Sequence, residues 1–381
     1  MIYRKIHALF LTLALMLALL AGLCAQPPSV LAVPAPASPG DLLSALPPSD
    51  LIVYLDAQRT LADAMPAFLA TKPEALTKIN AEIDKLKNET GIDLRTFDMV
   101  VAGLSFGGRA GQPERMVFLA RGRFDSSAVI NAGFAAAAKE KNNSFRKQQQ
   151  EDYKGKLIYT FGPSPSKGNL AGAAVISQPA ANTSAERPAA KLGDKQPTIV
   201  EVPREKSSDR GQAVTALDGN TLAAGDLGSV RAAIDASAGG AHVDDEMVQL
   251  ATRNTSALLG FSTKRAANLF PHGAAVGNEE PFMKSLQGVQ QVFGSVSVSG
   301  TDMDLSFSLR METAEQARGL REMVNIAKAE EEAKLQGRPA DSTPPFFMSL
   351  LRKLNVTVED KEVQVQLKMA QEEVPGFFPR F

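Results

Sequence analysis

The chain is poor in the side chains that catalysis and metal binding use most often. Its 381 residues include one cysteine, three histidines and no tryptophan. One cysteine excludes an internal disulfide, and so few histidines leave little material for a serine triad or a zinc site. With no tryptophan and four tyrosines, aromatic platforms for bases or sugars are scarce. These shortages favour a scaffold or binding role over catalysis.

The charges of the two signs nearly cancel. The chain carries 41 Lys and Arg against 42 Asp and Glu, a formal net charge of −1. Without a basic surplus we expect no nucleic-acid partner, and without an acidic surplus no role as a cation sink. Hydrophobic residues make up 44% and charged residues 22%, the balance of a globular protein long enough for two domains.

Residues 1–25 have the pattern of a secretory signal peptide. Arg4 and Lys5 precede an apolar run from Ala8 to Leu23, and cleavage is expected after Ala25 or Ala32. The run is short for a spanning helix, although an uncleaved anchor remains an alternative. No other stretch of the sequence is apolar enough to cross a bilayer. We therefore expect a periplasmic or secreted protein.

Cys24 lies at the end of the apolar run, where a lipoprotein would carry its lipid. Leu23 stands just before it, at a position where lipoprotein signals have Gly or Ala. Export without a lipid anchor is the prediction, and lipidation of Cys24 is the alternative. If cleavage follows Ala25, the mature chain has no cysteine, and its stability depends on its core.

The first folded segment is expected to follow a tether. Residues 26–48 are rich in Pro, Ala and Ser, which predicts an extended linker. Residues 49–161 then predict the order β-α-β-β-α-β. The expected strands are 51–55, 97–104, 115–123 and 156–161, and the expected helices are 60–70, 73–88 and 126–139. Thr71 and Glu74 predict a capping box before the second helix, and Gly91 predicts its end.

The second half, residues 241–381, predicts much the same order. Its expected strands are 256–262, 289–299, 303–310, 356–359 and 362–369, with helices at 281–287 and from 313 past 326. Thr313 and Gln316 form a capping box. The best internal match places residues 116–125 beside 304–313. We predict an α+β protein with antiparallel sheets, built from two ferredoxin-like repeats.

The residues between these repeats differ in composition. Residues 162–212 are rich in Pro, Ser, Ala, Lys and Gly without sustained periodicity, which predicts a disordered insertion. Residues 213–240 then predict a hairpin about Asp218-Gly219-Asn220 and a helix over 227–236, which complete the first half.

A metal site and a serine nucleophile each have a structural explanation that fits better. His242 is followed by Asp244, Asp245 and Glu246, a group that could bind a metal but also suits the first turn of a helix. Ser105 lies in a Gly-x-Ser-x-Gly pattern, but this pattern runs from a strand into a hairpin, not into the helix of a nucleophile elbow.

Two further glycine and histidine patterns are explained by turns. Gly107, Gly108 and Gly111 could form a phosphate loop, yet a strand follows them where a helix is required. His272 lies in a Pro-His-Gly stretch that predicts a surface turn.

The acidic and basic candidates have no identified partners. Asp98 and Asp226 could serve acid–base chemistry, but a turn before a strand and a helix N-cap explain them. Residues 139–156 are rich in Lys, Arg, Asn and Gln, which predicts a solvated helix end and loop. We assign no catalytic, cofactor-binding or metal-binding residue.

Several short phrases of the chain resemble a group of uncharacterised bacterial exported α+β proteins. They are Leu46 to Asp50, Thr90 to Leu94 with Asp98, Arg121 to Asp125, Tyr153 to Gly155, and Gly225 with Asp226. The resemblance covers residues 46–238 and implies an extracytoplasmic location. It implies no activity and carries no functional residue to this chain.

These observations predict a non-enzymatic envelope or secreted protein, without a cofactor. It would be a scaffold or binding module that uses sheet faces or a cleft between repeats to engage an unknown protein or envelope component. One alternative is a carboxylate-based hydrolase or other enzyme assembled from distant acids such as Asp98 and Asp226. The other is a peptide or inhibitor-like binder with an exposed strand edge.

Overall fold

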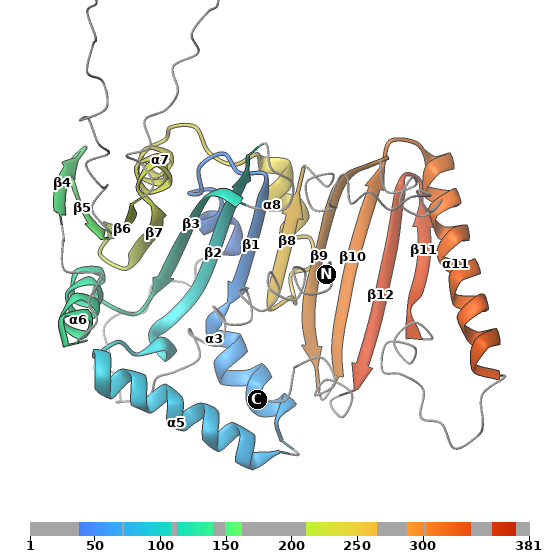
Figure 1. The fold of residues 1–381 in the computed structure, drawn as a ribbon, viewed down its shortest axis with the longest axis horizontal. Helices are drawn as coiled ribbons and strands as arrows, with labels where there is room; N and C mark the ends of the chain where they lie inside the picture. The colour runs from blue at the N-terminus through green and yellow to red at the C-terminus, as the bar shows by residue number, and fades with distance from the viewer. Residues whose placement is uncertain are drawn as a thin grey trace, which may run out of the picture.

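The described part of the chain builds a mixed α+β fold around one antiparallel sheet of twelve strands (Figure 1). The computed structural model describes residues 38–70, 72–107, 113–139, 149–161, 211–264, 288–300, 302–336 and 353–370. The strand order is β11-β12-β10-β9-β8-β1-β2-β3-β7-β6-β5-β4. The edges of this sheet are therefore β11 and β4.

Apart from β4, which was not predicted, the strands follow the predicted segments closely. Their bounds are β1 Leu51–Asp56, β2 Phe97–Phe106, β3 Pro113–Gly122, β4 Gln149–Tyr153, β5 Lys156–Phe161, β6 Gln212–Asp218, β7 Thr221–Asp226, β8 Leu259–Thr263, β9 Val289–Ser299, β10 Asp302–Met311, β11 Asn355–Glu359 and β12 Glu362–Ala370. Tight turns connect the strands of two hairpins. Lys154 and Gly155, both with positive φ, join β4 to β5. Gly219 and Asn220 form the predicted turn between β6 and β7, where the side chain of Asp218 accepts a hydrogen bond from the Asn220 backbone.

The helices are α2 Pro39–Leu43, α3 Ala57–Arg59, α4 Met65–Phe68, α5 Pro73–Thr90, α6 Ser126–Lys139, α7 Leu227–Ser237, α8 Asp245–Ala251 and α11 Ala314–Gln336. A π-helical turn, Thr60–Ala64, separates α3 from α4, so the helix expected over 60–70 is not continuous. Helix α5 ends at Gly91, whose φ of 76° is left-handed, as predicted. The capping box of Thr313 and Gln316 is confirmed by two hydrogen bonds. Among the described helices, none is long and apolar enough to cross a membrane.

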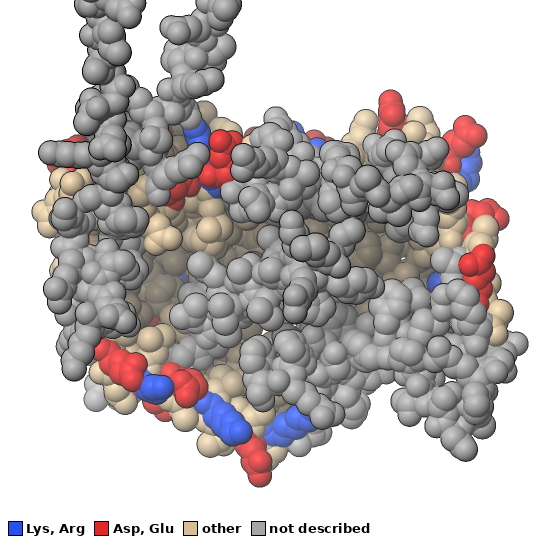
Figure 2. All heavy atoms as spheres, viewed as in Figure 1, with Lys and Arg blue, Asp and Glu red and all other residues tan. Residues whose placement is uncertain are grey.

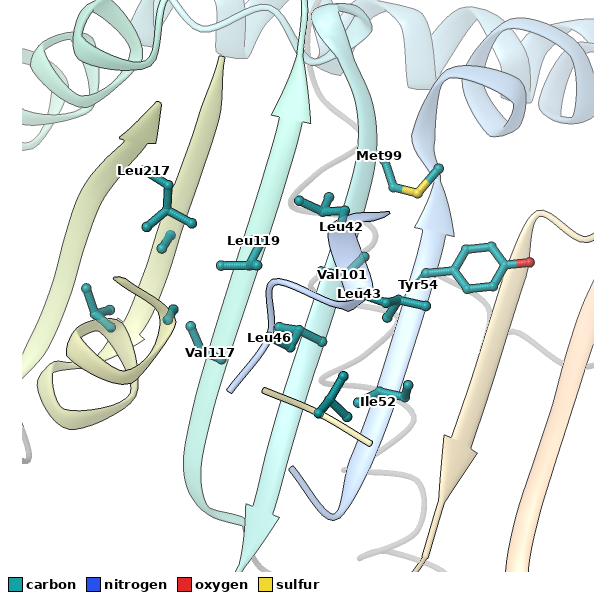
Figure 3. Close-up of a cluster of buried hydrophobic side chains, with 14 of the residues drawn as sticks. Leu42, Leu43, Leu46, Ile52, Tyr54, Met99, Val101, Val117, Leu119 and Leu217 are labelled. Atoms are coloured by element: carbon teal, nitrogen blue, oxygen red, sulfur yellow. The ribbon is translucent and has the colours of Figure 1, made fainter. Parts of the chain in front are cut away.

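One face of the sheet, here called the α7 face, is covered by α2, α7 and α8. Leu42, Leu43 and Leu46 lie over Ile52 and its neighbours in the core of this face (Figure 3). Val230 of α7 and Met247 of α8 belong to the same core, and α2 contacts α8. These buried side chains join α2, α7 and α8 to the centre of the sheet.

The other face, here called the α11 face, is covered by α5 and α11. Successive residues of a strand point to opposite faces. Val100, next to the α7-face residue Val101, packs with Ile83 of α5. Phe261, opposite Val53 in β1, packs near Leu320 of α11. Both helices therefore lie on the same side of one continuous sheet.

The tether expected over residues 26–48 ends earlier than predicted. Ser38 and Asp41 form a capping box at the start of α2, and Leu42, Leu43 and Leu46 are each 0% exposed. The prediction was wrong for 38–48 because the Pro, Ala and Ser content hid a helix of little more than one turn. Residues 26–37 and the predicted signal peptide lie outside the described residues, as do 162–210 of the predicted insertion and the expected helix at 281–287.

The ferredoxin-like arrangement is not confirmed. A split β-α-β unit requires parallel first and second strands with another strand between them. Here β1 pairs directly and antiparallel with β2, and on its other side with β8. The β1–β8 pairing joins both halves into one sheet.

The two halves nevertheless share another order. Each begins with a short helix, α2 or α8, and a central strand, β1 or β8. A hairpin follows, then a helix, then a second hairpin whose last strand pairs back onto the first hairpin. The pieces are β2–β3, α6 and β6–β7 in one half and β9–β10, α11 and β11–β12 in the other. Among the described residues, a further hairpin, β4–β5, is inserted in the first half and has no counterpart in the second.

Candidate functional site

The candidate site is the outer edge of β11. Glu359 and Glu362 close the β11–β12 hairpin around a two-residue turn, so they form a hydrogen-bonded pair. Bonding alternates along an antiparallel ladder. Asn355, Thr357 and Glu359 therefore bond to β12, whereas the N–H and C=O groups of Val356 and Val358 point away from it. In the described part of the chain, no strand pairs with these four backbone groups.

β11 lacks three features that commonly protect a sheet edge, namely lysine, proline and a bulge. Its sequence is Asn-Val-Thr-Val-Glu, without lysine or proline, and its register with β12 is unbroken by a bulge. Native edge strands are commonly blunted by such residues or by bulges. The side chains of Val356 and Val358 pack in the core under α11, while Asn355, Thr357 and Glu359 are exposed on the α7 face. β11 is thus firmly held on one side, and on its other side no described strand pairs with it.

The equivalent edge in the first half is already filled. β6 corresponds to β11 in the shared order, and β5 pairs antiparallel with β6. Tyr159 of β5 lies opposite Val214 of β6 and contacts Phe134 of α6, with 5.1 Å between ring centroids. Helix α6, which corresponds to α11, packs on β6 and also contacts the added strand β5 through Phe134.

The other edge strand, β4, carries charged and polar side chains that contact α7. Glu151 receives two hydrogen bonds from Arg231 of α7, of 2.9 and 2.7 Å. Tyr153 donates to Asp235 of α7, and Lys154 forms an ion pair with the same carboxylate. The hydrogen bond from Lys154 lowers the pKa of Asp235. Polar contacts thus tie this edge hairpin to α7. Residues 149–153 form a strand, so the prediction of a solvated helix end and loop over 139–156 was wrong for these residues.

A network of charged and polar side chains connects α8 to strands β9, β10 and β12. Arg310 of β10 donates to Glu362, Glu246 and Gln291, and Arg253 donates to Glu362. Burial alone would raise the pKa of Glu362, but the hydrogen bonds from Arg310 and Arg253 lower it overall. Both guanidinium groups also lie within 6 Å of the Phe293 ring centroid, at 5.8 and 5.6 Å. These groups satisfy one another, so the network has a structural role.

The acidic residues considered for catalysis lie apart. Asp226 caps α7 by accepting from the Ser229 backbone and also accepts from Met116 N–H, near the Leu104 end of β2. Asp98, in contrast, lies at the beginning of β2 and binds Arg123 at 3.1 Å. Burial raises the pKa of Asp98, and Arg123 opposes this rise. About six residue steps of strand, at roughly 3.3 Å each, separate the two acids, so they do not form one site.

The metal, serine and glycine candidates have structural roles where they are described. Asp244 caps α8 and pairs with Lys264, Glu246 binds Arg310, and the His242 ring contacts the Val243 carbonyl oxygen. Ser105 lies inside β2, and the predicted hairpin follows it. His272, Gly108 and Gly111 lie outside the described residues. Figure 2 shows Lys and Arg interspersed with Asp and Glu along α5, so this helix does not present one sign of charge.

Comparisons with known proteins identify no family. No protein family and no curated protein matches the chain. Solved structures of TP0453 are similar: crystal forms III and IV each at a TM-score of 0.42 and 8% identity, and form I at 0.38 and 7%. The alignments cover 90%, 88% and 87% of this chain and 97%, 95% and 94% of those chains. Likenesses at this level carry no function to this chain.

Sequence reasoning predicted the β11–β12 hairpin but not its place at the edge of the sheet. Strand order depends on long-range pairing, which the local pattern does not encode. The sequence did contain one signal for this edge. Only two strands are predicted after the helix that begins at residue 313, so few strands are left to pair beyond that hairpin.

Proposed function

We propose that this chain is an exported, non-enzymatic binding protein that captures an extended segment of a partner protein as an additional strand beside β11. One observation carries the proposal: β6 is extended by β5, whereas the corresponding strand β11 is not extended by any described strand. The proposed site is the exposed strand edge that the sequence analysis gave as an alternative, now assigned to β11. It takes the place of a cleft between repeats as the binding site.

The energetics of strand addition suit a reversible binding site. Val356 and Val358 offer four backbone groups to a captured strand, and each hydrogen bond contributes about 0.5–1.5 kcal/mol net. Backbone bonds of this kind give affinity, while pockets and neighbouring side chains give selectivity. β11 is held in place by β12 and by α11, so little of the site must be ordered on binding.

Export is supported by the sequence. The basic residues before the apolar run, the small residues after it and the resemblance to exported proteins favour an extracytoplasmic location. In an exporting bacterial host, mass spectrometry of the purified chain should find an N-terminus just after Ala25 or Ala32. A chain that keeps residues 1–25 and remains in the cytoplasm would contradict export.

The capture of a segment is tested by cross-linking at the edge. Benzoylphenylalanine placed at Thr357, which is exposed beside the edge, should cross-link a partner polypeptide in intact cells. Val358→Pro removes one outward N–H without breaking a bond to β12, and should abolish the cross-linked product.

The matched control is Gln150→Pro, at the corresponding outward position of the other edge strand. This variant should leave the cross-linked product at Thr357 unchanged. Loss of the product in both variants, or in neither, would contradict capture at β11.

A further inference from the structure

We infer that the captured segment runs antiparallel to β11 and is amphipathic, with apolar residues opposite Val356 and Val358 and a basic residue opposite Glu359. This inference rests on the proposed function, because it specifies the chemistry of the segment that the edge accepts. It is carried by the internal counterpart, β5 on β6, and by the different surroundings of β11 on each face.

The orientation follows from the sheet itself. Every neighbouring pair of strands in the described sheet is antiparallel, including β5 on β6. Antiparallel pairs are also slightly more stable per residue than parallel ones. In this orientation, Val356 and Val358 each face one residue of the captured segment in a hydrogen-bonded pair.

On the α11 face, the captured side chains meet an apolar surface. Residues directly opposite in a ladder share a face, so those opposite Val356 and Val358 point towards the α11 side. Both valines pack with Leu354 and with Val324 of α11. In the first half, the corresponding position is held by Tyr159, which contacts Phe134 of α6. Apolar residues, β-branched or aromatic, fit here.

On the α7 face, the two halves differ. Ile158 of β5 points to this face and is 0% exposed, in the core that α7 covers. At β11 no described helix covers this face, and Asn355, Thr357 and Glu359 are exposed. A captured segment therefore meets a polar surface here, and its side chains on this face should be polar. It differs in this respect from β5, which places Ile158 in a core.

The position opposite Glu359 favours a cation. Glu359 lies directly opposite Glu362, and like charges in such a pair are unfavourable. Glu362 is neutralised by Arg310 and Arg253. Glu359 accepts a hydrogen bond from Gln364, of 3.1 Å, and has no basic partner among the described residues. A basic side chain on the captured strand would supply that partner.

These positions define the order of residue types along the captured segment. The N-terminal end of an antiparallel segment lies beside Glu359, so the core reads basic, apolar, polar, apolar, polar. The probe is a fluorescently labelled synthetic peptide with the core Lys-Val-Thr-Val-Ser. Two comparison peptides carry the reversed order, Ser-Val-Thr-Val-Lys, and Glu in place of Lys. Binding to the mature chain is measured by fluorescence anisotropy.

The probe should bind up to about fivefold more tightly than either comparison peptide, the largest factor that one cross-strand ion pair supplies. Glu359→Lys should reverse the preference between the Lys and Glu peptides by a similar factor. Equal binding of all three peptides, with loss of binding in Val358→Pro, would overturn this inference and leave the proposed function standing.

Two other outcomes would overturn the proposed function as well. One is peptide binding that is unchanged by both Val358→Pro and Val356→Pro. The other is a marked fall in the melting temperature of these variants without any peptide, because it would show that a segment of the same chain already occupies the edge.

Discussion

The two halves of the sheet share an order but end differently. In the first half, β6 is followed outward by β5 and β4, and in the second half β11 is the last of the described strands. Helix α6 contacts β6, and α11 contacts β11. The position that β5 fills in one half is therefore filled by no described strand in the other. The inserted β4–β5 hairpin is therefore an internal example of a strand paired at this position.

The faces of the two outer regions differ as well. α7 covers the first half, and apolar residues such as Leu217 and Ile158 are buried beneath it. On the same side of the second half, the strands carry Ser306, Gln364 and Gln366 on neighbouring positions. An antiparallel sheet can leave one face to solvent. The second half thus keeps one apolar side under α11 and one polar side, as the inferred amphipathic ligand requires.

The largest predicted effect concerns the start of the fold. Leu42→Ala and Met247→Ala, on the corresponding helices α2 and α8, remove buried side chains from one core. Each should lower the free energy of unfolding by about 2–5 kcal/mol, measured by denaturant titration. Ser44→Ala, at the exposed residue just after α2, should change it by less than about 0.5 kcal/mol. A neutral Leu42→Ala variant would restore the tether predicted for residues 38–48.

A proline pair tests the direction of the backbone groups of β11. Thr357→Pro removes an N–H that bonds to β12, so it should lower the free energy of unfolding by about 1–3 kcal/mol. Val358→Pro removes an outward N–H and should lower it by less than half as much. The loss of stability in each variant is measured by thermal unfolding. Equal losses would show that the bonding alternation assigned to β11 is wrong.

The network at Arg310 predicts a dependence of stability on acid. Folding lowers the pKa of Glu362 below its ordinary value of 4.5. Its contribution is therefore complete above pH 4.5 and is lost as the pH falls through the lower, folded-state pKa. Glu362→Gln should reduce the free energy of unfolding at pH 7 by about 1.5 kcal/mol, and this difference should shrink at more acidic pH. Glu322→Gln, at an exposed position of α11, is the control.

The smallest predicted effect is at the opposite edge. Gln150→Pro removes an outward N–H from β4 and should change peptide binding at β11 by less than about twofold, since the two edges lie at opposite ends of the sheet. Anisotropy with the Lys-Val-Thr-Val-Ser peptide checks this. A large loss of affinity would show that the two edges are coupled and would weaken the comparison between them.

Local patterns in the sequence predicted most elements but not their arrangement. Alternation of apolar residues found β9, β10 and β12, and turn residues found the β6–β7 hairpin. The same signals missed α2, where the buried Leu42 and Leu43 lie among Pro, Ala and Ser. They also missed β4, a polar strand that Arg231 and Asp235 of α7 hold through Glu151 and Tyr153. Pairing of β1 with β8 joins residues over 200 positions apart, so it depends on packing that a local pattern does not contain.

The candidate site shows the same limit. Val356 to Glu359 was predicted as part of a hairpin, yet the edge exists only because no described strand pairs with β11 on its other side. The correspondence of β11 with β6 likewise becomes visible only in the strand order. Sequence reasoning did supply the relevant alternative, a binder with an exposed strand edge, without the residues that form it.

The most direct test is amide hydrogen exchange at β11, followed residue by residue by NMR with and without the Lys-Val-Thr-Val-Ser peptide. In the free protein, the amides of Thr357 and Glu359 should exchange slowly and those of Val356 and Val358 quickly. Added peptide should slow Val356 and Val358 selectively. Exchange that is slow at all four amides in the free protein, or unchanged by peptide at a concentration that saturates anisotropy, would contradict capture of a strand at this edge.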